Sequence, residues 1–156
     1  MYKYFLVFLI SMVPLIELRG ALPIALTMGL PTIEAYFLCI VGNMLPVPII
    51  YFFARKVLIW GADKKYIGKF FTFCLEKGEK AGQKLVATAG RGGLFIALTL
   101  FVGIPLPGTG AWTGALGASF LNMGFKSTVA SVSLGVVIAG IIMYIITSLG
   151  LHMFGL

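Results

Sequence analysis

Short apolar runs that end at polar breaks are the main pattern of this chain. The runs over residues 4–16 and 94–102 each lead into a break, and apolar runs over 20–30 and 111–121 follow. A helix over residues 4–16 would be about 20 Å long, whereas the hydrocarbon core of a bilayer is about 30 Å thick. Each pair of runs therefore predicts a re-entrant helical hairpin, which enters the membrane and returns to the same side.

Two longer apolar runs, residues 35–54 and 127–149, can each cross the bilayer. In the first, Asn43 together with Pro46 and Pro48 predicts a kink or break near mid-membrane. The unit of hairpin plus span occurs twice and crosses the membrane once each time, so the second unit enters from the opposite face. We expect an all-α integral membrane protein with an inverted repeat. Six ordinary membrane helices are the alternative, which the short runs disfavour.

The chain is expected to form one membrane domain, residues 1–156. Repeat 1 covers 1–54, a basic connector 55–92, and repeat 2 covers 93–156. In the connector, apolar residues at helical spacing share a face, which predicts an amphipathic helix on the membrane surface. This face comprises Ile67, Phe70, Phe71, Cys74 and Leu75. Glycines predict a loose far end, and they are Gly78, Gly82, Gly90, Gly92 and Gly93.

Composition and charge agree with a membrane location. The chain is 60% hydrophobic and 11% charged, against about 25% charged residues in soluble domains. Its net charge is +7, and nine of its twelve basic residues lie between Arg55 and Arg91, with Lys126 in a later turn. Because basic loops stay in the cytoplasm, we expect a cytoplasmic (inner) membrane, a cytoplasmic connector and both termini outside. Lys3 alone disagrees, and no nucleic-acid binding is needed to explain the charge.

The first break has the sequence PLIELRGALP. Pro14 and Pro23 bracket it, with Gly20 between them, and would end one half-helix and begin the next. Glu17 and Arg19 are the only ionisable residues at membrane depth, where a charge costs about 2.5–3.5 kcal/mol. Either they pair with each other to close the tip, or they act separately. In the second case Arg19 offers a fork for phosphate or carboxylate, and Glu17 carries a proton.

The second break, GIPLPGTGAW, lies at the matching place of the second half. Pro105 and Pro107 end the incoming helix. Gly108, Thr109 and Gly110 open the return helix, so unpaired N–H groups and the positive end of the helix dipole point to the membrane centre. The glycines permit a tight turn and close approach of a ligand. Thr109 can cap the return helix or donate to a substrate; the alternative is a plain loop without a ligand.

Other residues add less to the picture. Trp112 can fill space beside the tip or stack on a substrate, and Asn43 can cap the broken span or face the cavity. Small residues on the last helices let the helices pack closely. The two cysteines lie at different predicted depths, and His152 has no partner ligand nearby, so we expect no disulfide, metal or cofactor. Since no catalytic constellation lies at membrane depth, we do not expect an enzyme.

Together, the two breaks resemble a known family. Pro-x-x-Glu-x-Arg-Gly-Ala-x-Pro at 14–23 and Gly-x-Pro-x-Pro-Gly-Thr-Gly-Ala-Trp at 103–112 resemble the bacterial and archaeal small multidrug export family. The resemblance runs over essentially the whole chain. That family is distantly similar to the DedA/VTT superfamily, whose members share paired re-entrant hairpins and move undecaprenyl phosphate or scramble lipids. The resemblance implies tip roles for Glu17 and Arg19, and places 105–110 in the second tip.

We consider three functions. The first is secondary transport of an anionic amphiphile such as a lipid or polyprenyl phosphate, with Glu17 coupling a proton. The second is proton-coupled export of lipophilic cationic drugs through Glu17, which the neighbouring positive charge of Arg19 disfavours. The third is a membrane scaffold, which leaves the polar breaks unexplained. We expect a homodimer, because few helices would otherwise enclose a pathway. The candidate substrate-binding residues are Arg19, Asn43, Gly108, Thr109, Gly110 and Trp112.

Overall fold

Helices account for all the regular secondary structure in the residues that the structure, a computed structural model, describes: 2–14, 16–64, 68–106 and 108–153. A bilayer offers no water to hydrogen-bond the backbone, and a helix satisfies its own N–H and C=O groups. The all-α prediction is confirmed for this part of the chain.

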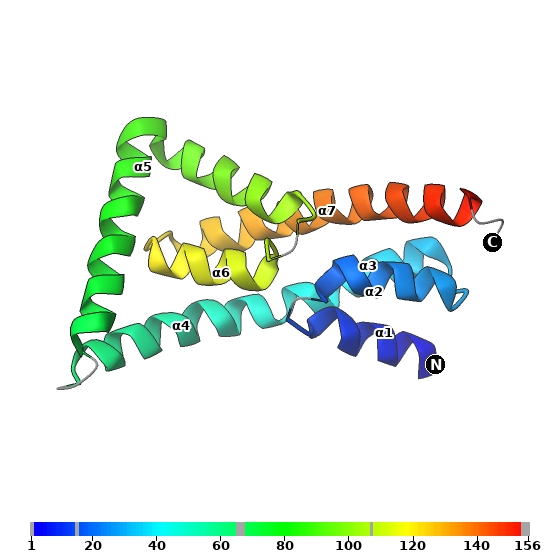
Figure 1. The fold of residues 1–156 in the computed structure, drawn as a ribbon, viewed down its shortest axis with the longest axis horizontal. Coiled ribbons are helices and arrows are strands. Elements are labelled where there is room, and N and C mark those ends of the chain that lie inside the picture. Colours follow the sequence, from blue (N-terminus) through cyan, green and yellow to red (C-terminus); the bar gives the residue numbers. More distant parts are fainter. Residues whose placement is uncertain (1, 15, 65–67, 107, 154–156) are drawn as a thin grey trace.

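The first half forms a helical hairpin and a long run. α1 (Tyr2–Met12) and α2 (Glu17–Thr27) pack against each other and against α3 (Thr32–Met44). α4 (Pro46–Ala62) follows α3. In Figure 1, α3 and α4 run from the end that holds both termini to the opposite end, whereas the α1–α2 hairpin turns back near the middle.

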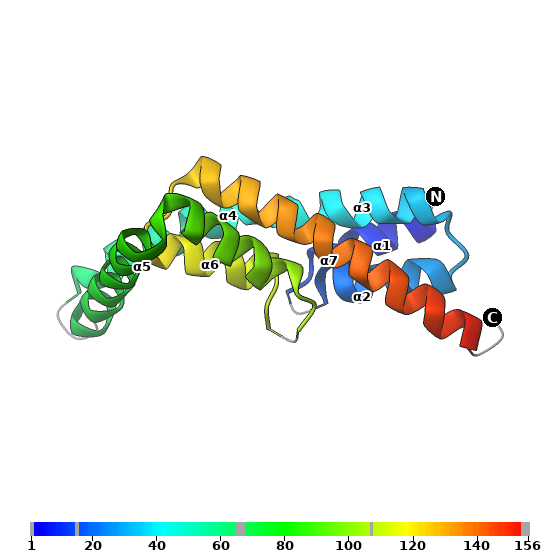
Figure 2. The same ribbon diagram turned by 90° about the horizontal axis from the view of Figure 1, so that it is seen from above.

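The second half has the same sequence of parts. α5 (Gly68–Gly103) turns a corner, α6 (Ala111–Phe120) returns, and α7 (Phe125–Met153) runs most of the length of the molecule. Figures 1 and 2 show that the turn between α5 and α6 lies near the middle, beside the turn between α1 and α2. Residues far apart in the sequence therefore meet there.

Two helical runs are long and apolar enough to cross a membrane. They are Thr32–Ala62, with 31 residues, and Phe125–Gly150, with 26 residues. At 1.5 Å per residue, each exceeds a hydrocarbon core of about 30 Å. α1 and α6 have 11 and 10 residues, or about 15–17 Å. The expected contrast between long spans and short hairpin legs is therefore present.

The break predicted around Asn43 is a gap in hydrogen bonding rather than a change of backbone conformation. Leu45 keeps helical angles, φ −60° and ψ −41°, and its N–H donates to Val41 O at 3.1 Å. Pro46 and Pro48 lack the N–H groups that would bond to the carbonyls four residues earlier. The helix direction therefore continues from α3 into α4.

Two predictions about helix ends are wrong. Pro23 lies inside α2 rather than at its beginning, because the helix already starts at Glu17 and Pro23 removes only the bond to the carbonyl of Arg19. The glycines expected to loosen the connector lie within α5, where the non-helical residue is Gly90, at φ 71° and ψ 177°. Gly90 thus makes the corner that divides α5 into two arms (Figure 1).

Polar side chains fasten helix ends at both ends of the molecule. Lys3 Nζ donates to Met28 O at 2.7 Å, where α2 ends. A cation is stabilised at the negative end of a helix dipole. Lys3, the basic residue that disagrees with the predicted topology, therefore stabilises the end of α2. At the opposite end, Arg55 donates to Asn122 Oδ1 in the turn between α6 and α7.

Val102 of α5 fills a space that two glycines leave open. A Cβ on Gly114 would lie 2.6 Å from Val102 Cγ2, and a Cβ on Gly135 would lie 2.7 Å from Val102 Cβ and 2.8 Å from Thr99 O. Val102 is only 1% exposed. Small residues therefore allow α6 and α7 to approach α5 closely, as the sequence predicts.

We expect Gly135→Ala to lower the free energy of unfolding by about 1–3 kcal/mol, because its methyl group would overlap Val102 and the Thr99 carbonyl. Thermal unfolding of the purified protein in detergent measures this loss. Gly150→Ala in the same helix is the control, since its Cβ would meet nothing within 4 Å. Equal stability of the two variants would contradict close packing of α5 on α7.

Candidate functional site

Glu17 caps α6, a helix of the other hairpin. Its carboxylate accepts hydrogen bonds from the N–H groups of Ala111, at 3.2 Å, and Trp112, at 3.1 Å. These are two of the N–H groups that the first turn of a helix leaves without intrahelical partners. Glu17 is 5% exposed, and a buried anion at this place faces the positive end of the helix dipole. α6 therefore compensates the charge of Glu17.

The backbone at both breaks is shaped for this contact. Glu17 has a φ of 50°, a left-handed conformation that is uncommon outside glycine. A Cβ on Gly110 would lie 1.8 Å from Glu17 Oε2. Gly110 itself is extended, at φ −133°, so glycine is needed there for space. Gly108, at φ 82°, supplies the left-handed turn of the loop.

Arg19 binds the end of α5. Its guanidinium donates to Thr109 Oγ1 at 3.1 Å and to three backbone carbonyls. The carbonyls are those of Val102 at 3.2 Å, Ile104 at 3.3 Å and Leu106. The last carbonyls of a helix lack intrahelical partners, and a cation is favoured beside them. Arg19 therefore fixes the path of the second break, as Glu17 fixes the start of the helix that follows.

The second hairpin also donates a hydrogen bond to the first hairpin, and further hydrogen bonds lie within the second hairpin. Trp112 Nε1 donates to Met12 O, at the end of α1, at 3.1 Å, so the second hairpin also caps the first. Thr113 Oγ1 accepts the Gly110 N–H at 2.8 Å. The Thr109 hydroxyl donates to a carbonyl of its own loop at 2.8 Å. Of the two roles predicted for Thr109, helix capping is therefore wrong.

We call this set of contacts between the two breaks the tip junction, formed by Glu17, Arg19, Thr109, Gly110 and Trp112. In the part of the chain that the structure describes, the side-chain hydrogen bonds of Glu17 and Arg19 go to the second break and to Val102 just before it. A hydrogen bond to a charged group contributes about 1.5–3 kcal/mol. Two or more such bonds on each side chain can therefore offset an insertion cost of about 2.5–3.5 kcal/mol per charge.

A cavity of about 130 Å³ lies beside the tip junction. Pockets for drug-sized ligands have about 300–1,000 Å³. The cavity is therefore small for such a ligand and suits a compact group beside Glu17 and Arg19. The lining residues that carry its chemistry are Glu17, Arg19, Gly108, Thr109, Gly110 and Trp112.

An apolar groove of about 260 Å³ lies between the second arm of α5 and α6. Leu94, Leu98 and Phe101 line it from α5, and Gly117 lines it from α6. Thr113 lines both the groove and the cavity. The two spaces are therefore neighbours, and the charged residues Glu17 and Arg19 line the cavity alone.

The remaining predicted residues are placed as follows. Asn43 is absent from the described lining of the cavity; it is 2% exposed, and its Oδ1 has no hydrogen-bond partner. Gly20 lies in the first turn of α2, where a Cβ would be 2.5 Å from Ile16 Cγ2. Pro14 lines the cavity and Pro105 lies in the second break. Pro107 lies outside the described residues.

Sequence reasoning missed two parts of the site. Thr113 stands three residues after Gly110, which is the spacing of a capping box, so a signal for it was present. The carbonyl partners of Arg19 have no such signal, because every residue carries a carbonyl. Over the described ranges, no three His, Cys, Asp or Glu side chains are grouped so that they could hold a metal ion.

We expect Gly110→Ala to lower the free energy of unfolding by about 1–3 kcal/mol, because its methyl group would overlap the Glu17 carboxylate. In a Glu17→Ala background the same methyl group should cost much less. Thermal unfolding of the four proteins in this double-mutant cycle should give a coupling of about 0.5–3 kcal/mol.

Gly117→Ala in the same helix is the matched control, since its Cβ would meet nothing within 4 Å. If Gly110→Ala costs as much without the Glu17 carboxylate as with it, Glu17 does not cap α6.

Comparison with protein families matches residues 17–142 to the family described as "Putative small multi-drug export protein". Comparison with curated proteins and with solved structures gives no match. The matched region covers most of the chain and includes Glu17, Arg19 and the whole second break. The family description indicates a membrane transporter, in agreement with the two apolar runs of spanning length. The chain therefore belongs to the small multi-drug export family.

Proposed function

We propose that this protein is a secondary transporter of an anionic amphiphile, such as a lipid or polyprenyl phosphate, whose headgroup binds beside the tip junction. One observation carries the proposal: Arg19 and Glu17, the residue that holds the first N–H groups of α6, line a small cavity that lies next to an apolar groove. Such a pair of spaces matches a ligand with a compact charged head and an apolar tail.

The arrangement of the helices supports a membrane placement with two re-entrant hairpins. Both hairpins turn near the middle of the molecule, while Thr32–Ala62 and Phe125–Gly150 run along it (Figure 2). In this placement, residues 93–156 repeat the unit of residues 1–54 with inverted orientation. The tip junction then lies near the bilayer midplane, where such transporters bind their substrates.

Charge gives the orientation of this placement. The end of α4, the first arm of α5 and the start of α7 lie at the end opposite both termini (Figure 1). They carry the exposed basic residues Lys56, Lys80 and Lys126. Basic segments stay on the cytoplasmic side, so the termini face outward from the inner membrane of a prokaryotic cell. Two copies of so small a chain would enclose a pathway better than one, and a homodimer belongs to the proposal.

The chemistry of the cavity favours an anion. Arg19 presents a permanently charged, planar fork that suits phosphate. The N–H groups of Ala111 and Trp112 are an anion site at a helix N-terminus, and Glu17 occupies it now. An anionic headgroup carries the same charge as the Glu17 carboxylate and can take its place on these N–H groups.

This replacement couples transport to a proton. A protonated Glu17 is neutral and is a weaker partner for the positive end of α6. The anionic headgroup then binds the free N–H groups, and Glu17 returns when its proton leaves. Each anion bound is thus accompanied by one proton on Glu17, with the apolar groove holding the tail.

Export of lipophilic cations is the second candidate, because the family description favours it. In that mechanism Glu17 would bind the cation directly. Arg19 lines the same cavity and repels a cation, and the cavity of about 130 Å³ is small for a drug-sized ligand. These two observations make the anionic amphiphile the better substrate.

Thermal unfolding in detergent tests the proposal with two probes, dodecyl phosphate and tetraphenylphosphonium. A ligand at 100 times its dissociation constant stabilises the folded protein by about 2.7 kcal/mol, and we expect this effect from dodecyl phosphate. Arg19→Gln should weaken binding by about tenfold or more, because a hydrogen bond to a charged group is lost.

Arg55→Gln is the control, since Arg55 binds Asn122 at the far end of the molecule. It should leave the effect of dodecyl phosphate unchanged. Stabilisation by tetraphenylphosphonium alone would favour the drug exporter, and an undiminished response of Arg19→Gln to dodecyl phosphate would contradict the proposed site.

A further inference from the structure

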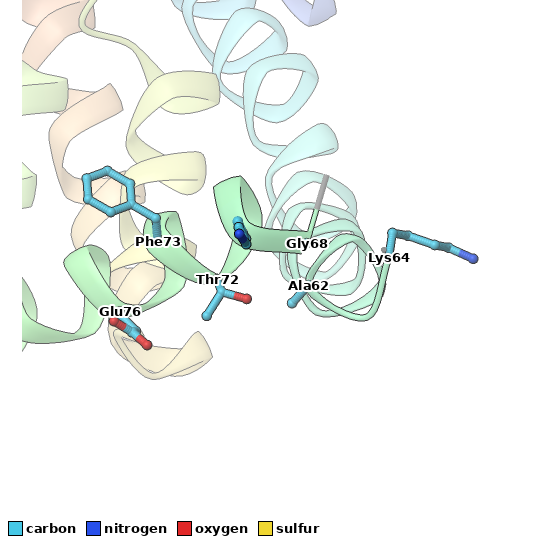
Figure 3. Close-up of a pocket in the computed structure, with 7 residues that line it drawn as sticks. Ala62, Lys64, Gly68, Thr72, Phe73 and Glu76 are labelled. Atoms are coloured by element: carbon cyan, nitrogen blue, oxygen red, sulfur yellow. The ribbon is translucent and has the colours of Figure 1, made fainter. Parts of the chain in front are cut away.

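The corner between α4 and α5 forms a second, open pocket of about 460 Å³. Figure 3 shows Lys64 extending away from the end of α4, with Thr72 and Glu76 along the first arm of α5. Lys69 and Phe73 also line this pocket. None of these residues belongs to the tip junction, so the corner is a separate place in the fold.

The first arm of α5 runs across the end of the molecule, whereas α4, α6 and α7 run along its length (Figure 1). If the long helices cross the bilayer, this arm lies in the plane of the membrane surface, as an interfacial helix does. The ring of Phe71 contacts Gly61 so closely that a Cβ on Gly61 would lie 2.5 Å from Phe71 Cγ. The arm is therefore held against α4 and the corner has a defined shape.

The amphipathic face predicted for this arm is only partly described. Phe71 packs against α4, whereas Phe70 is 66% exposed. Ile67 lies outside the described residues, and so do the side chains of Cys74 and Leu75. Of the described residues of the predicted apolar face, Phe71 therefore packs inside the protein and Phe70 exposes its ring on the surface.

Basic side chains line the corner and continue along the first arm of α5. Lys64 and Lys69 line the pocket together with the acid Glu76, and Asp63 is adjacent in sequence. The exposed Lys80 lies further along the arm, and the exposed Arg91 follows Gly90 at the opposite end of the arm. Over the whole arm the described exposed cations outnumber the described exposed anions, which attracts anionic headgroups.

Aromatic side chains accompany this charge. Lys64 Nζ lies 4.5 Å from the ring centroid of Trp60, which is 59% exposed. Phe70 presents a second exposed ring on the neighbouring arm. Aromatic residues next to lysines are typical of the boundary between headgroups and hydrocarbon. A soluble anion would need the lysines but not the exposed rings, so the corner fits a lipid better.

We propose that the corner binds the headgroup of an anionic phospholipid, with Lys64 and Lys69 on its phosphate and with Trp60 and Phe70 against the upper part of its acyl chains. The lipid anchors the first arm of α5 to the membrane surface. This site does not depend on which ligand the tip junction binds.

Native mass spectrometry of the full chain, equilibrated in detergent with equal amounts of phosphatidylglycerol and phosphatidylcholine, tests the proposal. The Arg19→Gln background is used throughout, so that lipid held at the tip junction contributes about tenfold less. We expect more phosphatidylglycerol than phosphatidylcholine on the protein. Lys64→Gln with Lys69→Gln should reduce this preference by about fivefold per lysine, and Glu76→Gln should increase it.

Lys126→Gln is the charge-matched control, because Lys126 is exposed at the same end but does not line the pocket. It should keep the preference, and the Lys64→Arg, Lys69→Arg double variant should keep it as well. An unchanged preference in the double Gln variant would overturn the proposal, as would equal binding of the two lipids by the protein with both lysines intact.

Discussion

A buried carboxylate holds the two halves of this protein together. Glu17 and Arg19 have opposite charges and stand two residues apart, but their side chains bind the other hairpin. Glu17 accepts hydrogen bonds from the start of α6, and Arg19 donates to Thr109 and to carbonyls at the end of α5. The carboxylate lies at the positive end of α6 and the guanidinium at the negative end of α5, so each charge meets the helix end that stabilises it. The left-handed backbone at Glu17 and the missing side chain at Gly110 are the local conditions for this fit.

The same groups that build the tip junction are those that would bind a substrate. An arginine and free N–H groups at a helix start are suited to a phosphate, yet here the protein's own carboxylate and carbonyls occupy them. This arrangement differs from the mutual pairing of Glu17 and Arg19 that the sequence leaves open, because the hydrogen bonds of both side chains go to the other hairpin. The contacts stabilise the closed arrangement of the hairpins, and a ligand of like charge can exchange with Glu17. In the proposed complex the small cavity holds the charged head of an amphiphile, and the adjoining apolar groove holds its tail.

Much of the fold could be predicted because its signals are local in sequence. Run length separates the half-length legs from the two long helices, and the polar breaks mark where the hairpins turn. Helix ends were less predictable: Pro23 at the end of the first break suggests a helix start, but α2 begins six residues earlier, at Glu17. Glycines in the connector indicate a loose segment, yet packing of Phe71 on Gly61 keeps the arm of α5 in place. The residues of the tip junction were predictable, whereas Thr113 was missed and Asn43 is absent from the described lining of the cavity. The pairing of these residues was not predictable, since every residue has a backbone carbonyl that Arg19 could bind.

The affinity of dodecyl phosphate for the wild type and for Glu17→Gln, measured at one pH, tests most directly whether Glu17 occupies the substrate's place. Glutamine keeps the size of the side chain but is an uncharged and weaker competitor for the N–H groups of α6. If the carboxylate acts as an internal substitute for the anion, Glu17→Gln binds dodecyl phosphate about tenfold more tightly, or about 1.4 kcal/mol. Equal or weaker binding by Glu17→Gln would contradict this exchange and would leave Glu17 as a structural cap alone.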